Sequence, residues 1–262
     1  MIGNIDKLNF LKFVIIGRHG NNGLGQRWID TGEFPTKEQI NQITSAQVDH
    51  LRLEGLDWPK DAITMIGLKR MDNLHKMLDY VRENNIEGDL IETGVWKGGA
   101  TIFMKLYCDI YGLDKKVFVC DSFEGLPKPS GKFSQDAGDN HYTFKELAIS
   151  LEEVQNNFRK FKCLDDKIVF IKGFFKDTLP NNEQIQKLSL LRMDGDMYES
   201  THDVFYSCYD KLVDKGVCII DDYCLKGAKD CTTDFRTIRN ITDPMTTVDR
   251  CGIYWIKNEL EK

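Results

Sequence analysis

The sequence predicts an α/β protein whose core is a doubly wound, mostly parallel sheet. Short apolar runs alternate with helical patterns from residue 71 onward, which is typical of consecutive βαβ units. Two of these runs, at 190–193 and 217–220, are followed at once by carboxylates. In an open parallel sheet, ligands bind just beyond the carboxyl ends of the strands. The pattern therefore predicts both the sheet and the edge that binds a ligand.

Residues 1–60 are expected to form an irregular N-terminal arm before a main domain at 61–262. Four glycines punctuate a polar stretch of this arm: Gly17, Gly20, Gly23 and Gly25. Their spacing matches neither the dinucleotide fingerprint nor the Walker pattern, so a flexible connection is favoured over a phosphate-binding loop. The apolar patch before residue 17 is interrupted by Lys12 and lacks a small-residue cleavage site, which argues against a signal peptide.

The main domain is expected to begin with a helix, because Leu74, Leu78 and Val81 recur at helical spacing. Strands and helices then alternate, and two short strands around Asp249 and Gly252 predict a C-terminal antiparallel hairpin. The strands are expected at 89–92, 117–120, 168–171, 190–193 and 217–220, the later helices at 102–110, 151–161 and 204–212, and the hairpin at 245–248 and 253–256.

The composition restricts the range of partners. The chain has 262 residues, 41% of them hydrophobic, and a formal net charge of −6 with a pI near 5.5. It lacks the basic excess expected of a nucleic-acid-binding face, and it is long enough to bury a large core. The N-terminal apolar patch is too short to span a bilayer. We therefore expect a small-molecule partner, without nucleic acid or membrane.

Eight cysteines are scattered along the chain, without a C-x-x-C pair that would suggest a zinc or redox site. Several lie inside apolar strand patterns, where cysteine acts as a small hydrophobic residue. The reducing cytoplasm is the simplest location for such a chain.

The acids that follow two of the predicted strands are candidate metal ligands. Asp194 follows one apolar run, and Asp221 and Asp222 follow the next. On neighbouring strands these side chains would converge on one crevice, where a hard cation such as Mg2+ relieves the repulsion between carboxylates. The sequence therefore predicts a metal site.

The turn at 92–99 and the nearby Asp121 predict a site for an adenosine-containing ligand. Glycines in the turn, including Gly94, permit backbone conformations closed to other residues and let a ligand approach closely. Glu92 is placed to accept a hydrogen bond from the amino group of a cationic ligand. Asp121 closes the second strand, where an acid can bind the two hydroxyls of a ribose. A plain tight turn and a simple strand terminator are the alternatives.

The segment 127–141 is rich in Pro, Gly, Ser and Asp and is too long for a simple connection. It is interpreted either as a lid over the site or as a disordered surface loop. His141 and His202 lie near the predicted crevice and are candidates for proton transfer, whereas single histidines more commonly serve surface or packing roles.

Parts of the sequence resemble the macrocin O-methyltransferase family, which methylates sugar hydroxyls in macrolide and related pathways. The strongest similarities lie at 89–99, 191–201 and 221–223, and lesser ones at 58–59, 64–70, 174–180 and 249–255. The run around Met193-Asp194-Gly195-Asp196 is far more specific than a glycine pattern. The resemblance covers the chain from Trp58 onward.

The resemblance implies a class I S-adenosylmethionine-dependent O-methyltransferase with a Rossmann-like fold, a divalent metal and a sugar-containing acceptor. It also implies metal carboxylates at Asp194, Asp221 and Asp222. Asp194 or the neighbouring Asp196 is the first candidate for the base that deprotonates the acceptor, and His141 is a further one. The residues expected to hold the donor lie in strand-end turns: Glu92, Thr93, Gly94, Trp96, Gly99, Asp121, Ser122, Phe123, Gly173 and Phe174.

Two other classes of function stay open at this point. A nicotinamide-dependent oxidoreductase can use the same architecture, although the G-x-G-x-x-G fingerprint is absent. A non-catalytic metal- or nucleotide-binding module would use the same crevice without turnover. We expect a homo-oligomer, and we expect the N-terminal arm to serve oligomer contacts and acceptor choice.

Overall fold

The computed structural model describes residues 2–18 and 23–258 of the chain. Its centre is a seven-stranded sheet in the order β3-β2-β1-β4-β5-β7-β6. The strands are β1 (Asp89–Thr93), β2 (Val117–Asp121), β3 (Ile168–Lys172), β4 (Leu188–Met193), β5 (Leu212–Ile220), β6 (Thr246–Thr247) and β7 (Ile253–Ile256). The first five are parallel, and β7 is antiparallel to both β5 and β6. The predicted doubly wound sheet with a C-terminal hairpin is confirmed.

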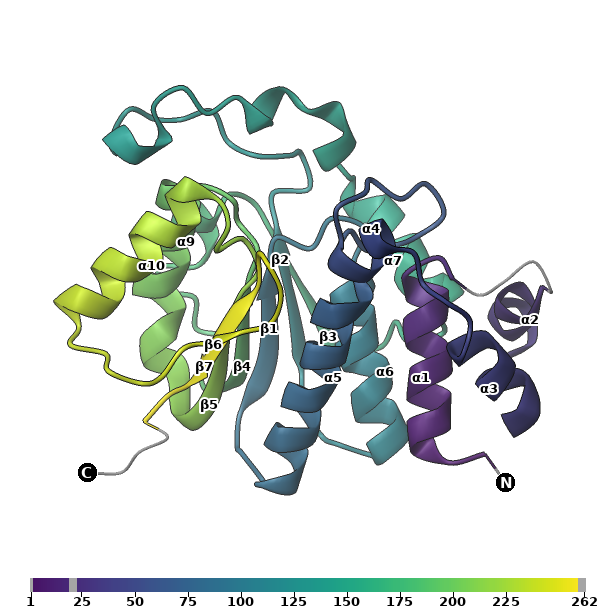
Figure 1. Ribbon diagram of the computed structural model, residues 1–262. Coiled ribbons are helices and arrows are strands. Elements are labelled where there is room, and N and C mark those ends of the chain that lie inside the picture. The colour runs from purple at the N-terminus through teal and green to yellow at the C-terminus, as the bar shows by residue number, and fades with distance from the viewer. Residues whose placement is uncertain (1, 19–22, 259–262) are drawn as a thin grey trace.

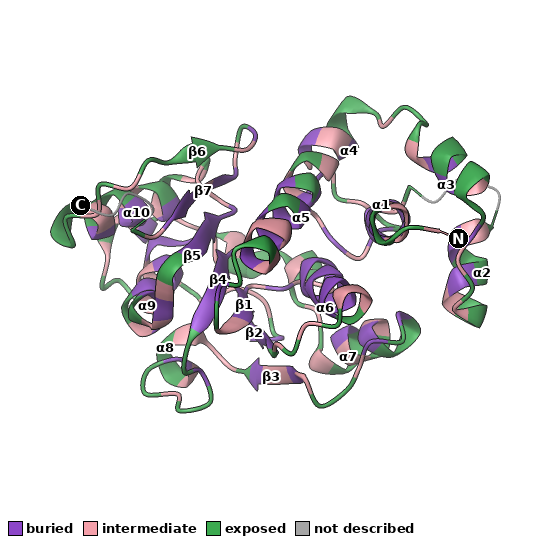
Figure 2. Ribbon diagram, turned by 90° about the horizontal axis from the view of Figure 1, so that it is seen from below, coloured by how far each residue is buried: buried purple, intermediate pink, exposed green. Residues whose placement is uncertain are grey.

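Helices cover both faces of the sheet (Figure 1). The α-helices are α1 (Asn4–Ile15), α2 (Leu24–Thr31), α3 (Lys37–Thr44), α4 (His50–Glu54), α5 (Leu68–Glu83), α6 (Gly99–Tyr111), α7 (Leu151–Lys160), α8 (Phe175–Thr178), α9 (Tyr198–Cys208) and α10 (Lys226–Ile238). Short 3-10 turns are η1 (Ser134–Asp136), η2 (His141–Thr143), η3 (Lys145–Leu147) and η4 (Tyr209–Lys211). Seen from below, α5, α6 and α7 lie on one side of the strands, and α8, α9 and α10 on the other (Figure 2).

The two faces of the sheet form two hydrophobic clusters. Successive side chains of a strand point to opposite faces. In β4, Leu190 packs in the cluster that contains residues of α1, α5 and α6, whereas Leu191 packs with residues of α9 and α10. Both faces of the parallel strands are therefore buried, which explains why these strands are continuous apolar runs rather than alternating ones.

The expectation of an irregular N-terminal arm is wrong with respect to its secondary structure. Helix α1 packs in the cluster of α5 and α6, and its Leu8, Phe10 and Leu11 are fully buried. Lys12, which interrupts the apolar patch in the sequence, pairs with Asp72 of α5. A helix that is buried around most of its circumference shows no clear amphipathic period, so the pattern was not visible. Gly20 lies outside the described residues.

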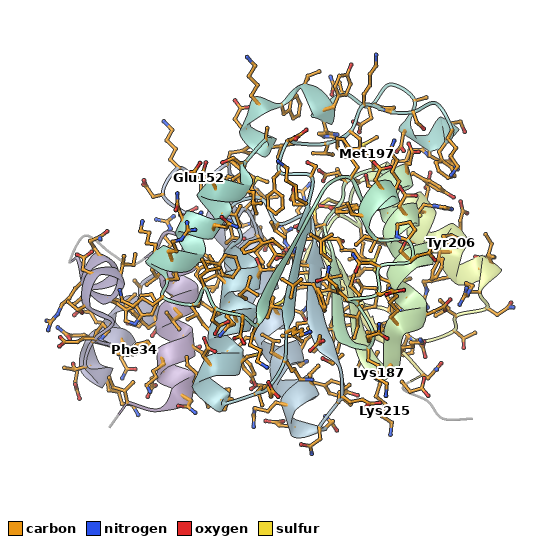
Figure 3. The ribbon with its side chains drawn as sticks, turned by 180° about the vertical axis from the view of Figure 1, so that it is seen from behind. Phe34, Glu152, Lys187, Met197, Tyr206 and Lys215 are labelled. Atoms are coloured by element: carbon orange, nitrogen blue, oxygen red, sulfur yellow. A yellow bond between two sulfur atoms is a disulfide. The ribbon has the colours of Figure 1, made fainter. Side chains whose placement is uncertain are left out.

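The carboxyl ends of the central strands are level with one another. Thr93 at the end of β1 pairs in register with Cys120 of β2 and Met193 of β4, and Met193 pairs with Ile220 of β5. The residues that follow these strands therefore emerge side by side at one edge. Figure 3 shows Met197 at this edge, beneath the segment 122–150, which arches over it. Lys187 and Lys215 lie toward the opposite end of the sheet.

Two details differ from what the sequence suggested. Helix α9 ends at Cys208 and β5 begins at Leu212, so Leu212 is a strand residue and not the end of a helix. Cys224 and Cys251 form a disulfide. The wide spacing of these cysteines gave no indication of that bond, because β5 and β7 bring them together only in the folded chain.

Within the described residues, no helix is long and apolar enough to cross a membrane.

Candidate active site

The three acids predicted to hold a metal come together at the strand edge. One carboxylate oxygen from each of Asp194, Asp221 and Asp222 lies within 4.8 Å of the others. Asp194 follows β4 directly, and the other two follow β5, so the parallel pairing of these strands produces the convergence. We call these three residues the acid cluster. Oxygen atoms at this spacing suit a hard divalent cation.

Arg192 forms ion pairs with the acid cluster from within the sheet. This arginine lies within β4 and is 1% exposed. Its guanidinium pairs with Glu92 and Asp221, and its Nη1 lies 2.9 Å from Oδ2 of Asp194. Glu92 is itself 2% exposed, and burial raises the pKa of its carboxyl. The structure thus places Glu92 in an internal ion pair instead of at the surface of a ligand pocket.

Arg70 forms a second ion pair with the acid cluster, from helix α5. It lies in the first turn of α5, where it pairs with Asp221, and its Nε lies 3.0 Å from Oδ2 of Asp249. Its Nη2 also donates to the carbonyl oxygens of Glu54 and Gly55 at 3.3 Å. Arg70, a residue of α5, therefore connects Asp221 to the end of α4 and to the loop before β7. Arg70 carried no functional signal in the sequence beyond its place in the similar stretch 64–70.

Negative charge exceeds positive charge around the acid cluster. Two guanidinium groups are accompanied by the carboxylates of Glu92, Asp194, Asp196, Asp221, Asp222 and Asp249. Burial raises the pKa of Asp222 well above its ordinary range, and the charges of Asp194 and Asp196 raise it further. Burial and the charge of Asp194 likewise raise the pKa of Asp196 to about 7. A bound cation would oppose these shifts, because its positive charge stabilises the ionised carboxylates.

Gly94 lies where the end of β1 packs against the end of β4, and we call this contact the joint. Its φ is +85°, and a Cβ at this position would lie 1.7 Å from the carbonyl oxygen of Asp194. The backbones are tied here by hydrogen bonds from Gly94 N to Cys120 O at 2.9 Å and from Asp194 N to Thr93 O at 2.8 Å. Glycine is therefore required by the packing of the strand ends, and not only by the approach of a ligand.

Asp121 organises the turns on the other side of this joint. Its Oδ2 accepts a hydrogen bond from Val95 N at 2.8 Å, and its Oδ1 accepts one from Phe123 N at 2.8 Å. Burial raises the pKa of the Asp121 carboxyl, while these backbone donors lower it. Oδ1 also accepts from Ser122 Oγ at 3.4 Å. Oδ2 keeps a second lone pair, with which the side chain can still accept a hydrogen bond from a ligand hydroxyl.

A pocket opens between these turns and the acid cluster. Seven of the predicted residues line it: Gly94, Trp96, Asp121, Ser122, Phe174, Asp194 and Asp196. Five predicted donor-binding residues do not line it: Glu92, Thr93, Gly99, Phe123 and Gly173. His141 borders an adjoining hollow that it shares with Asp196, and its Nδ1 lies 2.7 Å from Oδ2 of Asp139. His202 stacks instead on Tyr206.

Several pocket residues carried no functional signal in the sequence. Met65 and Phe175 are apolar examples. Met65 is positioned through Arg52, whose Nη2 donates to the neighbouring Ile66 O at 2.7 Å. Phe175 begins α8, a helix of four residues that is too short to show a period. Both lie in stretches that are similar to the family, which is the one signal that could have identified them.

The arch segment, residues 122–150, passes over the carboxyl ends of the strands (Figure 1). Leu126 and Leu147 from its two ends line the pocket. Asp136 in its middle accepts hydrogen bonds from Tyr198 N at 2.7 Å and Glu199 N at 2.9 Å, so it caps the first turn of α9. The arch is therefore anchored to α9, as a cover of the site would be.

The strand order, with helices on both faces of the sheet, is that of the class I methyltransferase fold. The sequence profile of the macrocin-O-methyltransferase (TylF) family matches residues 9–257, and the chain belongs to this family. The match begins within α1, so the similarity extends well beyond the region from Trp58 onward that the motifs suggested. The chain is accordingly an O-methyltransferase.

Individual proteins agree with this assignment. The chain is 42% identical over 227 residues to demethyldecarbamoylnovobiocin O-methyltransferase of Streptomyces niveus, with 84% of this chain and 85% of that protein covered. It is 40% identical over 216 residues to mycinamicin III 3''-O-methyltransferase of Micromonospora griseorubida, with 80% and 85% covered. The structure of the O-methyltransferase NovP superposes with a TM-score of 0.83 at 37% identity, covering 97% of this chain and 99% of NovP.

Proposed function

We propose that this protein transfers a methyl group from S-adenosylmethionine to a hydroxyl of a sugar, with the help of Mg2+. The acceptor sugar would belong to a glycoside, a sugar nucleotide or another natural product. The observation that carries the proposal is the acid cluster beside a pocket that Gly94 and Asp121 border, in a chain of the macrocin O-methyltransferase family. The relatives support the acceptor class, because their names specify natural products and one of the names specifies a rhamnosyl group.

The residues of the acid cluster fit a divalent cation. They supply oxygen donors from three carboxylates within 4.8 Å of one another, and the surrounding charge is negative in excess of the two arginines. Their contacts with Arg192 and Arg70 leave lone pairs on the carboxylate oxygens. Bound there, Mg2+ would lower the pKa of the acceptor hydroxyl and fix its direction.

The donor pocket and the acid cluster divide the work of the reaction. S-adenosylmethionine would supply the methyl group by in-line displacement at its sulfonium, which demands alignment of donor and acceptor. Asp121 and Ser122 would bind the donor from the turn after β2, and Gly94 and Trp96 from the turn after β1. Asp194 lies at the boundary of the two regions, where it would accept the proton of the hydroxyl while Arg192 keeps it oriented.

Asp196 and His141 are further candidates for the base, because they border the hollow next to the acid cluster. We assign that polar hollow to the acceptor sugar. We also propose that residues 1–60 contribute to oligomer contacts and acceptor choice, that the protein is a homo-oligomer, and that it works in the cytoplasm without nucleic acid or membrane.

Mass spectrometry of methyl transfer tests the proposal. The protein is incubated with S-adenosylmethionine, Mg2+ and a panel of glycosides and sugar nucleotides, and the acceptors are examined for the mass of one added methyl group. Turnover should disappear in EDTA and return with excess Mg2+. Full turnover in EDTA would disprove the metal requirement. Calorimetry with NAD in parallel distinguishes the oxidoreductase alternative, since only S-adenosylmethionine and its demethylated product should bind.

A further inference from the structure

The Cys224–Cys251 disulfide connects the loop after β5 to the loop before β7. These strands are antiparallel neighbours, with Ile220 opposite Ile253, so the two loops leave the sheet at the same end. That end is also the edge that carries the acid cluster. The disulfide therefore connects two loops at the edge of the sheet that carries the proposed cation site, and it does not lie in a remote part of the surface.

Polar contacts close this disulfide into a ring with the acids. Oδ1 of Asp249 accepts a hydrogen bond from Cys251 N at 2.8 Å, and Oδ2 of the same residue accepts one from Arg70 Nε at 3.0 Å. Arg70 pairs in turn with Asp221, three residues before Cys224. The ring runs from Asp221 along the chain to Cys224, across the disulfide to Cys251, and back through Asp249 and Arg70.

The ring depends on the disulfide for its covalent closure. Asp221 has a second anchor in Arg192, but Asp222 has no arginine among the ion pairs of the described residues and accepts from the backbone N of Asp196 at 3.1 Å. Only one residue, Tyr223, separates Asp222 from Cys224, the nearer end of the disulfide. Opening the bond would therefore loosen Asp222 more than Asp221.

Cys224 is exposed and Cys251 is partly exposed, whereas the six other cysteines are buried thiols. A dithiol reductant can therefore reach this bond selectively. Its thiolate would attack one sulfur of the bond and release the other as a thiolate, which takes up a proton. The second thiol of the reductant then displaces the remaining cysteine. Two electrons pass to the protein, and the products are two cysteine thiols and an oxidised dithiol.

We propose that the Cys224–Cys251 bond is a redox-controlled clamp on the acid cluster. The oxidised form holds Asp221 and Asp222 in the arrangement that binds a divalent cation, and reduction by a dithiol loosens it and weakens cation binding. This inference rests on the proposed function, because it takes the acid cluster to be a cation site. The donor pocket shares Asp194 with the acid cluster, but none of its lining residues belongs to the ring, so donor affinity is unaffected.

Calorimetry on the full-length protein tests the clamp. MgCl2 alone is titrated into oxidised protein and into protein reduced with dithiothreitol, and S-adenosylhomocysteine is titrated into both. Native alkylation followed by mass spectrometry reports the state of the two cysteines. Reduction should weaken Mg2+ binding by about tenfold, the low end of the effect of losing a support to metal ligands. The affinity for S-adenosylhomocysteine should stay the same.

The matched control is the double variant Cys224→Ser and Cys251→Ser, which has no bond to reduce. It should bind Mg2+ as weakly as the reduced protein and should not respond to dithiothreitol. Equal Mg2+ affinity of the oxidised and reduced forms would overturn the clamp and leave the proposed function intact. Equal weakening of both ligands, or free thiols at both positions under oxidising conditions, would also overturn it. If neither form bound Mg2+ while both bound S-adenosylhomocysteine, the metal assignment and the clamp would fail together.

Discussion

Carboxylates at the two halves of the strand edge have opposite kinds of partner. In the half formed by β1 and β2, Asp121 accepts hydrogen bonds from the backbone N–H groups of Val95 and Phe123, which are neutral. In the half formed by β4 and β5, Asp221 pairs with the charged Arg192 and Arg70. Two further acids, Asp194 and Asp222, lie close to Asp221.

The difference shows what each half can bind. An acid that is satisfied by neutral amides shapes a turn and keeps lone pairs for hydroxyl groups, which suits the ribose of a donor. Acids that outnumber their arginines leave an excess of buried negative charge, which suits a cation. The residue type is the same in both halves, so the partners alone distinguish the two roles. Changes confined to one half should therefore affect one ligand.

Gly94→Ala should have the largest effect, because it breaks the joint that both halves share. The added Cβ would meet the carbonyl oxygen of Asp194 at a φ of +85°, and the backbone there cannot yield easily. We expect a loss of about 3 kcal/mol in the free energy of unfolding, measured with urea.

Gly112→Ala is the matched control for this change. Its φ is +66°, but a Cβ there would meet nothing within 4 Å. Only the cost of the left-handed backbone should appear, about 1 kcal/mol. Equal losses at the two glycines would show that Gly94 is not a packing joint, and the division of the edge into two halves would lose its structural basis.

Asp194→Asn should separate catalysis from donor binding. The substitution keeps the shape of the side chain but removes a charge of the acid cluster and the first candidate for the base. Turnover should fall by at least about a hundredfold, whereas the dissociation constant of S-adenosylhomocysteine should change little. Asp214→Asn, at an exposed position whose carboxylate contacts Asn258, should change neither quantity. Normal turnover of Asp194→Asn at limiting Mg2+ would remove this residue from the metal and base roles.

The sequence was sufficient for the sheet and for the convergence of acids, because both depend on local patterns. Apolar runs that end in Asp194 and Asp221 identify strand ends, and parallel pairing places such ends together. The disulfide could not be predicted, since Cys224 and Cys251 are brought together by the antiparallel pairing of β5 with β7. Helix α1 was missed because burial on most sides removes the amphipathic signal.

The roles of individual acids were harder to predict than their presence. Glu92 was expected to meet a ligand, but its partner is Arg192, one hundred residues later in the chain. An arginine inside an apolar strand gave no indication of which acids it would join. Arg70 was missed for the same reason, because its partners Asp221 and Asp249 are distant in sequence and close only across the strand edge.

Asp121→Ala tests the donor half in the same way that Asp194→Asn tests the acid half. The change removes a carboxylate that orders two turns and faces the pocket. Losing a buried, charged hydrogen-bond partner costs about 1.5 to 3 kcal/mol, so the affinity for S-adenosylhomocysteine should fall roughly ten- to a hundredfold. Mg2+ affinity, measured by calorimetry on the same preparation, should be retained. An unchanged dissociation constant for S-adenosylhomocysteine would remove Asp121 from the donor site.

Asp136→Ala should have the smallest effect and should sharpen the comparison by acting on the cover of both halves. The variant loses the cap of α9, which costs about 1 kcal/mol and lowers the Tm by roughly 3 °C. Ser150→Ala, which removes the side-chain cap of α7, should cost about the same. Only Asp136→Ala also frees the arch segment from α9, so only this variant should raise the acceptor KM by several-fold. If both variants lost stability equally and neither changed the acceptor KM, the arch would be a packed loop that takes no part in holding the acceptor.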